Sequence, residues 1–327
     1  MDVLIAHRGE EHVLRLLVAL NKAYQVKNLG RPSSFVGMKI RHEADTIYLS
    51  QETYINELLY RFAMDEARPT YTPMIPKSHL DNLTDDPAES EREYMHNKPY
   101  RQVAGSLLKD AWNAAKYLLR YLGQTRHLKL KLQPTEEGIG AASDADWVND
   151  VHDRKSLSGY MAFLFGCPVH WGSTKQTVVG LSSTTAEFIA ANDALQQAKW
   201  IQLVTAEVLT HANPLQLTLQ VDNQPAIHRI KRDGSSGSQK VVDIRFHALK
   251  DAWQTGLMGL EYVPTHHNLA DLMTKALSRP ELHHKRGLCG LGSEPGGDLG
   301  AAACGGGVGQ QPVSEDKQQL PVSGSCK

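Results

Sequence analysis

The acidic residues that follow one small-residue segment are the first feature of this sequence to suggest chemistry. Asp144 and Asp146 lie two residues apart in the stretch AASDADWVND, residues 141–150. In an extended chain, side chains two residues apart project from the same face. Carboxylates held so close repel each other unless a positive charge lies between them. The spacing therefore suggests a cation next to this strand.

Three further carboxylates occupy comparable places downstream. Glu187 stands in the first turn of an expected long helix, Asp222 ends an expected strand, and Asp271 opens an expected final helix. Strand ends and adjoining helix starts converge at one edge of an open sheet, so these side chains are expected to meet Asp144 there. Carboxylate oxygens suit a hard cation such as Mg²⁺. Two such ions, about 3.5–4 Å apart, can hold the attacking and leaving oxygens of a phosphoryl displacement.

Each acid also has a structural interpretation. Glu187 fits a capping box that begins at Thr184, and Asp271 suits a helix start through the helix dipole. Asp222 can begin a turn before the proline that follows it, and Asp144 can be solvated surface charge. From the residues alone, a metal–carboxylate site is therefore a hypothesis.

The elements that would position these acids lie between residues 139 and 280. A strand over 139–147 precedes two more, SGYMAFLFG and CPVHWGSTK, and a long helix is expected from Ser183 to Leu209. The remaining expected elements are the strand LQLTLQVDN, a short helix, a basic loop at 231–240, a helix over 241–255, the strand LMGLEYVPT and a final helix, NLADLMTKAL. Three strands followed by alternating helix and strand fit an α/β fold with a mixed sheet.

Composition sets the limits on the class of protein. The chain has 327 residues and a formal net charge of −1, so it is not the strongly basic body of a dedicated nucleic-acid binder. It has no run of eighteen apolar residues, and its start does not read as a signal peptide. The four cysteines show no metal-site spacing. We expect an intracellular location, cytoplasmic or nuclear, and no membrane partner.

The motifs in order resemble a known family. SDADW, DRKSLSGY, SSTTAEF, VDNQPAI, VVDIRFHALKD and YVPTHHNLADLMTKAL are similar to the ribonuclease H domain of copia-type LTR-retrotransposon Pol polyproteins. Upstream, VKNLGRPSSFVGMKI, IYLSQETYINELLYRFAMDEARPTYTPM and PYRQVAGSLL resemble the C-terminal part of the same polyprotein's reverse transcriptase. Together these segments cover most of the chain apart from its Gly-rich end.

The resemblance implies a fold and a division of the chain. The fold class is α/β, a ribonuclease H-like mixed five-stranded sheet with flanking helices, preceded by a truncated α+β reverse-transcriptase remnant. The expected divisions are a palm remnant at 1–65, a linker with a truncated thumb or connection remnant at 66–138, the ribonuclease H-like domain at 139–280 and a disordered Gly-rich tail at 281–327.

The resemblance also implies an activity. Asp144, Glu187, Asp222 and Asp271 correspond to the catalytic and metal-binding quartet of a Mg²⁺-dependent enzyme that cuts the RNA strand of RNA–DNA hybrids. Two Mg²⁺ ions are expected, with Mn²⁺ as a substitute. His266 is a candidate for assisting product release.

Substrate binding needs phosphate contacts, and a local excess of basic residues could supply them. The candidates for nucleic-acid contact are Arg229, Lys231, Arg232, Lys240, Arg245 and Lys250. A solvated helix surface with a mobile loop explains the same charges equally well. The expected partners are an RNA–DNA hybrid and other Pol-derived chains.

Departures from the family pattern keep a second interpretation open. Only Asp2 could match the paired aspartates of the polymerase motif, and the expected fingers and most of the palm have no counterpart in the sequence, so no polymerase activity is expected. The segment after LLKD is also shortened, which suggests a degenerate copy. The alternative function is a non-catalytic retroelement remnant with at most nucleic-acid binding. A different nuclease or an integrase on a similar acidic sheet is a third interpretation.

Overall fold

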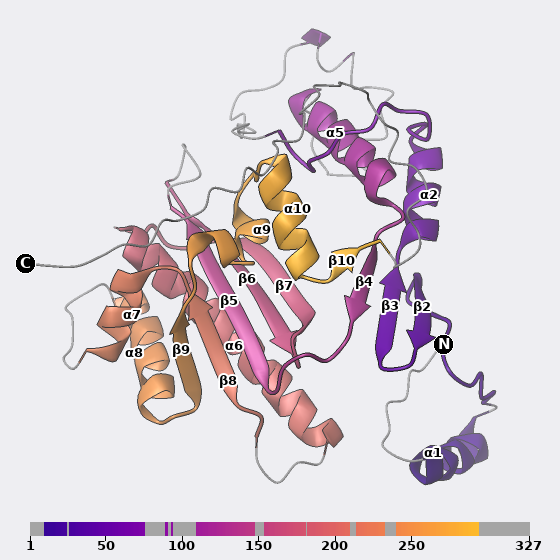
Figure 1. Ribbon diagram of the computed structural model, residues 1–327, viewed down its shortest axis with the longest axis horizontal. Helices are drawn as coiled ribbons and strands as arrows, with labels where there is room; N and C mark the ends of the chain where they lie inside the picture. The colour runs from indigo at the N-terminus through magenta and orange to yellow at the C-terminus, as the bar shows by residue number, and fades with distance from the viewer. Residues whose placement is uncertain are drawn as a thin grey trace, which may run out of the picture. The chain divides into compact units, whose positions relative to one another are not determined.

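The computed structural model of the chain describes residues 10–24, 26–75, 89–90, 93, 109–147, 154–180, 182–209, 214–232 and 240–293. The start of the expected palm remnant, most of the expected linker, part of the basic loop and the tail from residue 294 lie outside the described residues. The strands of the described residues form two five-stranded sheets (Figure 1).

The first sheet contains strands from the beginning and the end of the described chain. Its strand order is β1 (Ser34–Phe35), β2 (Met38–Glu43), β3 (Thr46–Ser50), β4 (Lys129–Leu132) and β10 (Leu291–Gly292). Its accompanying helices are α1 (Glu10–Ala23), α2 (Glu52–Arg61) and α5 (Lys109–Thr125). Leu59 of α2 is fully buried, and Gly123 of α5 lies close to it, which brings these two helices together.

The second sheet has the predicted ribonuclease H-like architecture. Its order is β7 (Cys167–Lys175), β6 (Leu157–Leu164), β5 (Ile139–Asp146), β8 (Leu217–Val221) and β9 (Met258–Tyr262). The first three strands are antiparallel, whereas β8 pairs parallel with both β5 and β9. The mixed sheet and its strand order confirm the fold predicted from the motifs.

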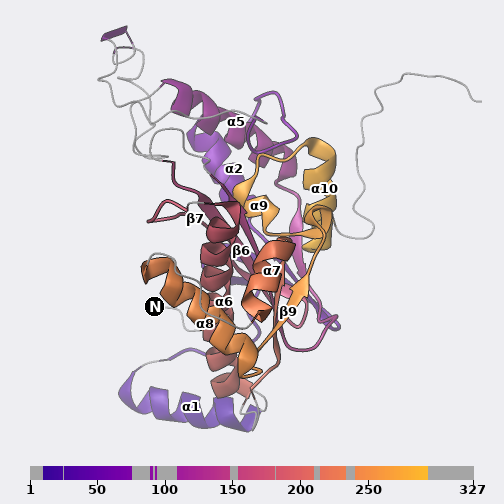
Figure 2. The ribbon, with the colours of Figure 1, turned by 90° about the vertical axis from the view of Figure 1, so that its left-hand side faces the viewer.

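Three helices cover one face of this sheet. They are α6 (Ser183–Leu209), α7 (Gln224–Lys231) and α8 (Lys240–Gln254), and Figure 2 shows α7 and α8 beside α6. Phe188 of α6, Phe246 of α8 and Leu219 of β8 belong to one buried core. Small side chains, such as Ala141 on β5 and Ala194 on α6, let the long helix approach the central strand closely.

The opposite face carries the C-terminal elements, and here the structure differs from prediction. The expected final helix over 268–277 is only the single turn α9 (Asp271–Thr274), preceded by the 3₁₀ turn η1 (Thr265–His267). Backbone extended at Lys275 ends α9. The helix starts only at Asp271 because the Asn268 side-chain oxygen accepts from the Ala270 backbone N–H at 3.1 Å, which holds residues 268–270 in a turn.

The prediction of a disordered tail from residue 281 is wrong for its first part. A further helix, α10 (Arg279–Leu288), and strand β10 occupy residues 279–292. Glu281 starts this helix because its carboxylate accepts hydrogen bonds from the Ser278 backbone N–H and hydroxyl, at 3.1 and 2.6 Å. Leu282 and Cys289 are buried, which gives the segment its own packing surface. None of the helices in the described ranges has the length and apolar character needed to cross a membrane.

Candidate metal centre

Three aspartates from separate elements converge at one end of the second sheet. Asp144 is near the end of β5, Asp222 directly follows β8, and Asp271 is the first residue of α9. One carboxylate oxygen from each lies within 4.8 Å of the others. Asp144 and Asp271 are buried, with 1% and 3% exposure, whereas Asp222 is half-buried. The predicted convergence of these three acids is therefore present in the fold, with Asp222 as its accessible member.

Glu187 adds a fourth carboxylate from the first turns of α6. Its pKa is raised to about 9 by burial and, further, by the nearby charges of Asp144 and Asp222. The backbone N–H of Ala145 donates to this carboxylate, but Oε2 has no hydrogen-bond partner among the described residues. Burying a carboxylate oxygen without a hydrogen-bond donor costs free energy, and a bound cation would remove that cost. Glu187 is therefore a candidate metal ligand.

The capping interpretation of Glu187 does not match the start of α6. The helix begins two residues earlier than a cap at Thr184 requires, and the Ser182 hydroxyl accepts from the Thr185 backbone N–H at 3.2 Å. Asp222 is likewise not needed for the following turn, because the neighbouring Asn223 caps α7 through the Ala226 N–H at 2.9 Å. Both acids are available for another role.

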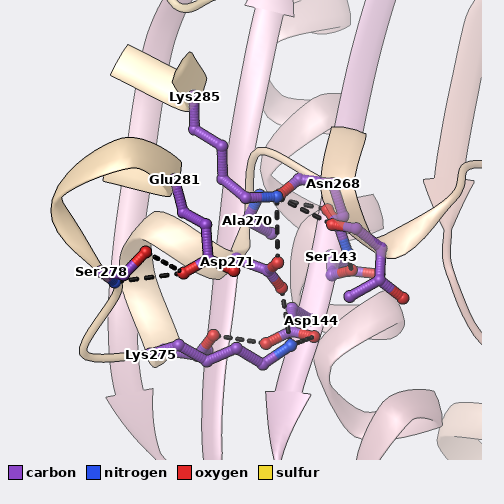
Figure 3. Close-up of polar contacts among 11 residues, drawn as sticks. Ser143, Asp144, Asn268, Ala270, Asp271, Lys275, Ser278, Glu281 and Lys285 are labelled. Carbon is purple, nitrogen blue, oxygen red and sulfur yellow. Dashed lines mark hydrogen bonds and ion pairs between the residues drawn. The ribbon is translucent and has the colours of Figure 1, made fainter. Parts of the chain in front are cut away.

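The positive charge expected between the acids is supplied in this structure by Lys275. Its ammonium donates to Asp144 Oδ1 at 3.0 Å and to Asp271 Oδ1 at 2.7 Å (Figure 3). Burial opposes the charged form, but the attraction of the two aspartates outweighs it and raises the pKa of Lys275. The side chain is 34% exposed, so it reaches the acids from the solvent side.

A second ammonium, that of Lys285, holds Asp271 from inside the protein. It lies 3.0 Å from Asp271 Oδ2 and donates to the backbone carbonyls of Thr265 and Asn268, each at 2.8 Å (Figure 3). Only 3% of this side chain is exposed. Three oxygen partners for one buried ammonium make a fully satisfied site, which fixes the orientation of Asp271.

Asp144 is oriented by the same short helix. The Thr274 hydroxyl donates to Asp144 Oδ2 while Lys275 holds Oδ1. Burial raises the pKa of Asp144, and the ion pair with Lys275 and the Thr274 hydrogen bond oppose that rise. Both oxygens of the central carboxylate therefore have fixed directions before any substrate binds.

Asn268 connects the turn before α9 to the central strand. Its side-chain amide, fully buried, donates to the Ser143 carbonyl at 2.9 Å and accepts from the Ala270 N–H at 3.1 Å. One side chain therefore sets the distance between β5 and α9, and with it the spacing of Asp144 and Asp271.

Other predicted site residues have varied positions. Asp146 is half-buried and lies outside the three-aspartate group. His266 is exposed on η1, with its ring centroid 4.1 Å from that of His267. His266 thus lies at the surface on the segment that precedes Asp271. Its role in product release stays a prediction.

The predicted basic surface divides into internal and exposed members. Arg229 lies over the rings of Phe188 and Phe246, at 5.4 and 5.6 Å from their centroids. Lys250 has a structural role instead of the expected surface role, because it is 9% exposed and donates to the Arg232 carbonyl at 2.9 Å.

The other members differ in accessibility. Arg245 is half-buried and acts electrostatically on Asp193, whose pKa burial raises and Arg245 lowers. Lys231 and Arg232 are exposed. The side chain of Lys240 lies outside the described residues. Among the predicted members whose side chains the structure describes, Lys231 and Arg232 are the exposed ones.

The donor set fits a divalent cation. Four carboxylates provide the oxygen ligands that Mg²⁺ prefers, and one of them, Glu187, has an oxygen with no hydrogen-bond partner among the described residues. His and Cys are absent from the described cluster. Asp144, Asp222, Asp271 and Glu187 would hold the metal. Sequence reasoning missed Lys275, Lys285, Thr274 and Asn268, and only the four-residue spacing of Asp271 and Lys275 signalled such a contact.

Comparison with known proteins gives relatives over most of the chain. The sequence is 28% identical over 319 residues to the retrovirus-related Pol polyprotein from transposon TNT 1-94 of Nicotiana tabacum, covering 89% of this chain and 24% of that protein. It is 30% identical over 306 residues to the retrovirus-related Pol polyprotein from transposon RE2 of Arabidopsis thaliana, covering 85% and 20%. The chain thus spans less than a quarter of each polyprotein's length.

A shorter segment of the chain is similar to a further protein. Over 96 residues the chain is 45% identical to the secreted RxLR effector protein 161 of Plasmopara viticola, covering 29% of this chain and 67% of that protein. No protein-family model matches the sequence.

The similar solved structures include two ribonuclease H proteins. The N-terminal ribonuclease H domain of a Mycobacterium tuberculosis protein has 10% identity and a TM-score of 0.30, covering 46% of this chain and 98% of that chain. A ribonuclease H1 isolated from compost has 13% identity and a TM-score of 0.32, covering 42% and 92%. Because these scores are low, the fold assignment rests on the strand order.

Proposed function

We propose that this chain, a relative of the copia-type retrotransposon Pol polyproteins, is a Mg²⁺-dependent ribonuclease that hydrolyses the RNA strand of RNA–DNA hybrids. The observation that carries the proposal is the convergence of Asp144, Asp222 and Asp271 within 4.8 Å, beside the orphaned Oε2 of Glu187. The site contains the oxygen ligands that a phosphoryl-transfer metal uses, and the Lys275 ammonium between Asp144 and Asp271 marks a position that favours a cation.

The chain's own residues prepare the site for that reaction. Thr274 and Lys285 fix the directions of Asp144 and Asp271, so little reorganisation is needed when substrate arrives. Asp222, half-buried, is the most accessible of the three aspartates and would meet the nucleic-acid strand. When bound, Mg²⁺ would lower the pKa of the attacking water and neutralise charge at the leaving oxygen.

Two basic side chains near the acids could contact the substrate. Lys231 and Arg232 are exposed at the end of α7, which begins two residues after Asp222. They would contact phosphates of the hybrid and give a salt-dependent affinity without sequence preference.

The test is cleavage by the purified full chain. A hybrid labelled on each strand is incubated with Mg²⁺, beside Asp222→Asn and the control Asp251→Asn, an exposed helix-surface acid. Asn keeps the size of Asp222 but removes the charge that a metal needs. We expect the parent and Asp251→Asn to cut the RNA strand only, and Asp222→Asn to lose cutting. Equal cutting by Asp222→Asn would overturn the proposal.

A second function is favoured by one observation, the pair of ammonium groups on the acids. Because Lys275 and Lys285 already balance the buried aspartates, the fold can persist without metal, as a non-catalytic retroelement remnant would. In that case the parent cuts no strand but binds hybrid with an affinity that falls as salt rises. Cutting of duplex DNA would instead indicate a different nuclease.

A further inference from the structure

The two ammonium groups at the acids differ in how firmly they are held. Lys285 stands in the last turn of α10, has 3% of its side chain exposed and contacts three oxygens. Lys275 stands just past the end of α9, in extended backbone, and has 34% of its side chain exposed. The first is enclosed by the fold, whereas the second can turn toward solvent without moving a helix.

The two lysines also divide the oxygens of Asp271 between them. Lys285 contacts Oδ2, while Lys275 contacts Oδ1 and, in the same position, Oδ1 of Asp144. Departure of Lys275 would therefore free one oxygen on each of two buried carboxylates. Asp271 would remain oriented, because Lys285 and its backbone partners do not depend on Lys275.

We propose that Lys275 is an exchangeable internal cation: its ammonium holds the two aspartates together without metal and must leave before a divalent ion binds. This inference rests on the proposed function, since it takes the acids to be the metal site. An ammonium and a divalent cation repel each other, and both require the same oxygens, so the two forms of the site exclude one another. The lysine thereby lowers the apparent affinity of the site for metal, and it raises the stability of the chain when no metal is bound.

A purely structural ion pair would behave differently. If Lys275 only strengthened the fold, removing its charge would lower stability and either leave metal affinity unchanged or weaken it. Competition predicts instead that removing the charge of Lys275 raises the affinity for metal, because the metal ion no longer has to displace the ammonium. Metal affinity and metal-free stability therefore separate the two roles.

The experiment measures Mg²⁺ and Mn²⁺ binding to the full chain by calorimetry, with melting temperatures recorded in chelator. The variants are Lys275→Gln, which removes the charge, Lys275→Arg, which keeps it, and Lys39→Gln, an exposed control in the first sheet. We expect Lys275→Gln to melt at a lower temperature in chelator and to bind Mg²⁺ about tenfold more tightly, equivalent to about 1.4 kcal/mol. Lys275→Arg and Lys39→Gln are expected to bind as the parent does.

Several outcomes would overturn the inference. They are unchanged or weaker binding by Lys275→Gln, an equal gain in Lys275→Arg, and no metal binding by any variant. If Lys275→Gln does not fold in chelator, its recovery is titrated with Mg²⁺. Recovery below the concentration that shifts the parent's melting temperature supports competition, and absence of recovery counts against it.

The result is independent of the cleavage assay. Tighter metal binding by Lys275→Gln in a chain that cuts no hybrid would support competition and remove the proposed function. Hybrid cleavage combined with unchanged metal affinity would do the reverse. Adding Asp222→Asn to Lys275→Gln shows that the measured ion is at this site, because the double variant should lose the gain.

Discussion

Gly159 of β6 faces Thr274 of α9 so closely that a Cβ atom at residue 159 would lie 2.6 Å from Thr274 Cγ2. The same added atom would lie 2.8 Å from Met273 Cβ and 3.0 Å from the Ala270 carbonyl oxygen. Gly159 is the partner of Asp144 across the β5–β6 pair. The missing side chain lets α9 lie directly over the central acid.

Replacing Gly159 by alanine should therefore push α9 away from the sheet. We expect a loss of about 1–3 kcal/mol in the free energy of unfolding, together with weaker metal binding, because Asp271 and Lys275 move with the helix. Chemical denaturation and calorimetry measure the two effects. Gly123→Ala is the matched control, since its added Cβ would meet Leu59 at an ordinary 3.5 Å within a helix. A Gly159→Ala protein with parental stability would show that α9 adjusts freely.

Lys285 is expected to be a stability residue as well as a positioning one. Lys285→Met leaves one Asp271 oxygen and two backbone carbonyls without their buried donor. Breaking a buried ion pair from one side costs about 3–5 kcal/mol, so a large drop in denaturant midpoint should follow. Lys39→Met, on the exposed side of β2, should change stability by less than about 0.5 kcal/mol. A small effect of Lys285→Met would mean that Asp271 is held by other contacts.

The stability of the metal-free chain should fall as pH rises. Burial, followed by Asp144 and Asp222, raises the pKa of Glu187 from 4.5 to about 9. The folded chain therefore keeps a proton that the unfolded chain releases. The stabilisation from this group is complete below about pH 4.5 and is lost as pH rises through about 9. Asp144, with its pKa raised mainly by burial, contributes in the same direction.

Melting temperatures in chelator at pH 6 and pH 9 test this dependence. We expect a lower melting temperature at pH 9 for the parent and a smaller decline for Glu187→Gln, which cannot ionise. Saturating Mg²⁺ should also reduce the decline, because ligand carboxylates bind metal in their ionised form. A parent that is equally stable at both pH values would contradict the raised pKa of the buried Glu187 carboxyl.

The position of α10 sets a testable boundary for the domain. A chain that ends after Leu277 lacks Lys285 and β10, whereas one that ends after Ser293 keeps both. We expect the shorter chain to lose at least about 3 kcal/mol of stability, because Asp271 loses its buried partner. Thermal unfolding of both chains measures the difference. Equal melting temperatures would show that residues 278–293 are dispensable for the fold.

Much of the second sheet could be predicted from the sequence because its elements have strong local patterns. The long helix was expected over 183–209 and occupies Ser183–Leu209, and the small-residue strand was expected to begin at 139, where β5 begins. The acids at strand ends and helix starts meet because those ends share one edge of the sheet. Alternation and periodicity carry this information along a few neighbouring residues.

The parts that were missed depend on contacts between distant residues. A buried lysine such as Lys285 has the same local pattern as a surface lysine, and its partner Asp271 lies 14 positions earlier. The Gly-rich composition near the end of the sequence predicts disorder for residues 281–327, although Ser278 and Glu281 form a helix start. The short α9 also follows from Asn268, whose buried bond to Ser143 joins positions 125 residues apart.

The pairing of β10 with β4 means that the polypeptide leaves the second sheet beside the place where it entered. Leu291 and Gly292 are paired with Leu130 and Lys129, and the Lys131 N–H donates to the Gly290 carbonyl at 2.8 Å. The two strands that connect the second sheet to the rest of the chain are therefore paired with each other. Such pairing brings the two ends of the intervening segment together, so the segment resembles a domain inserted between two neighbouring strands of the first sheet. Under a pulling force applied at residues 128 and 293, the β4–β10 pairs would separate one after another before the force reached the acidic site.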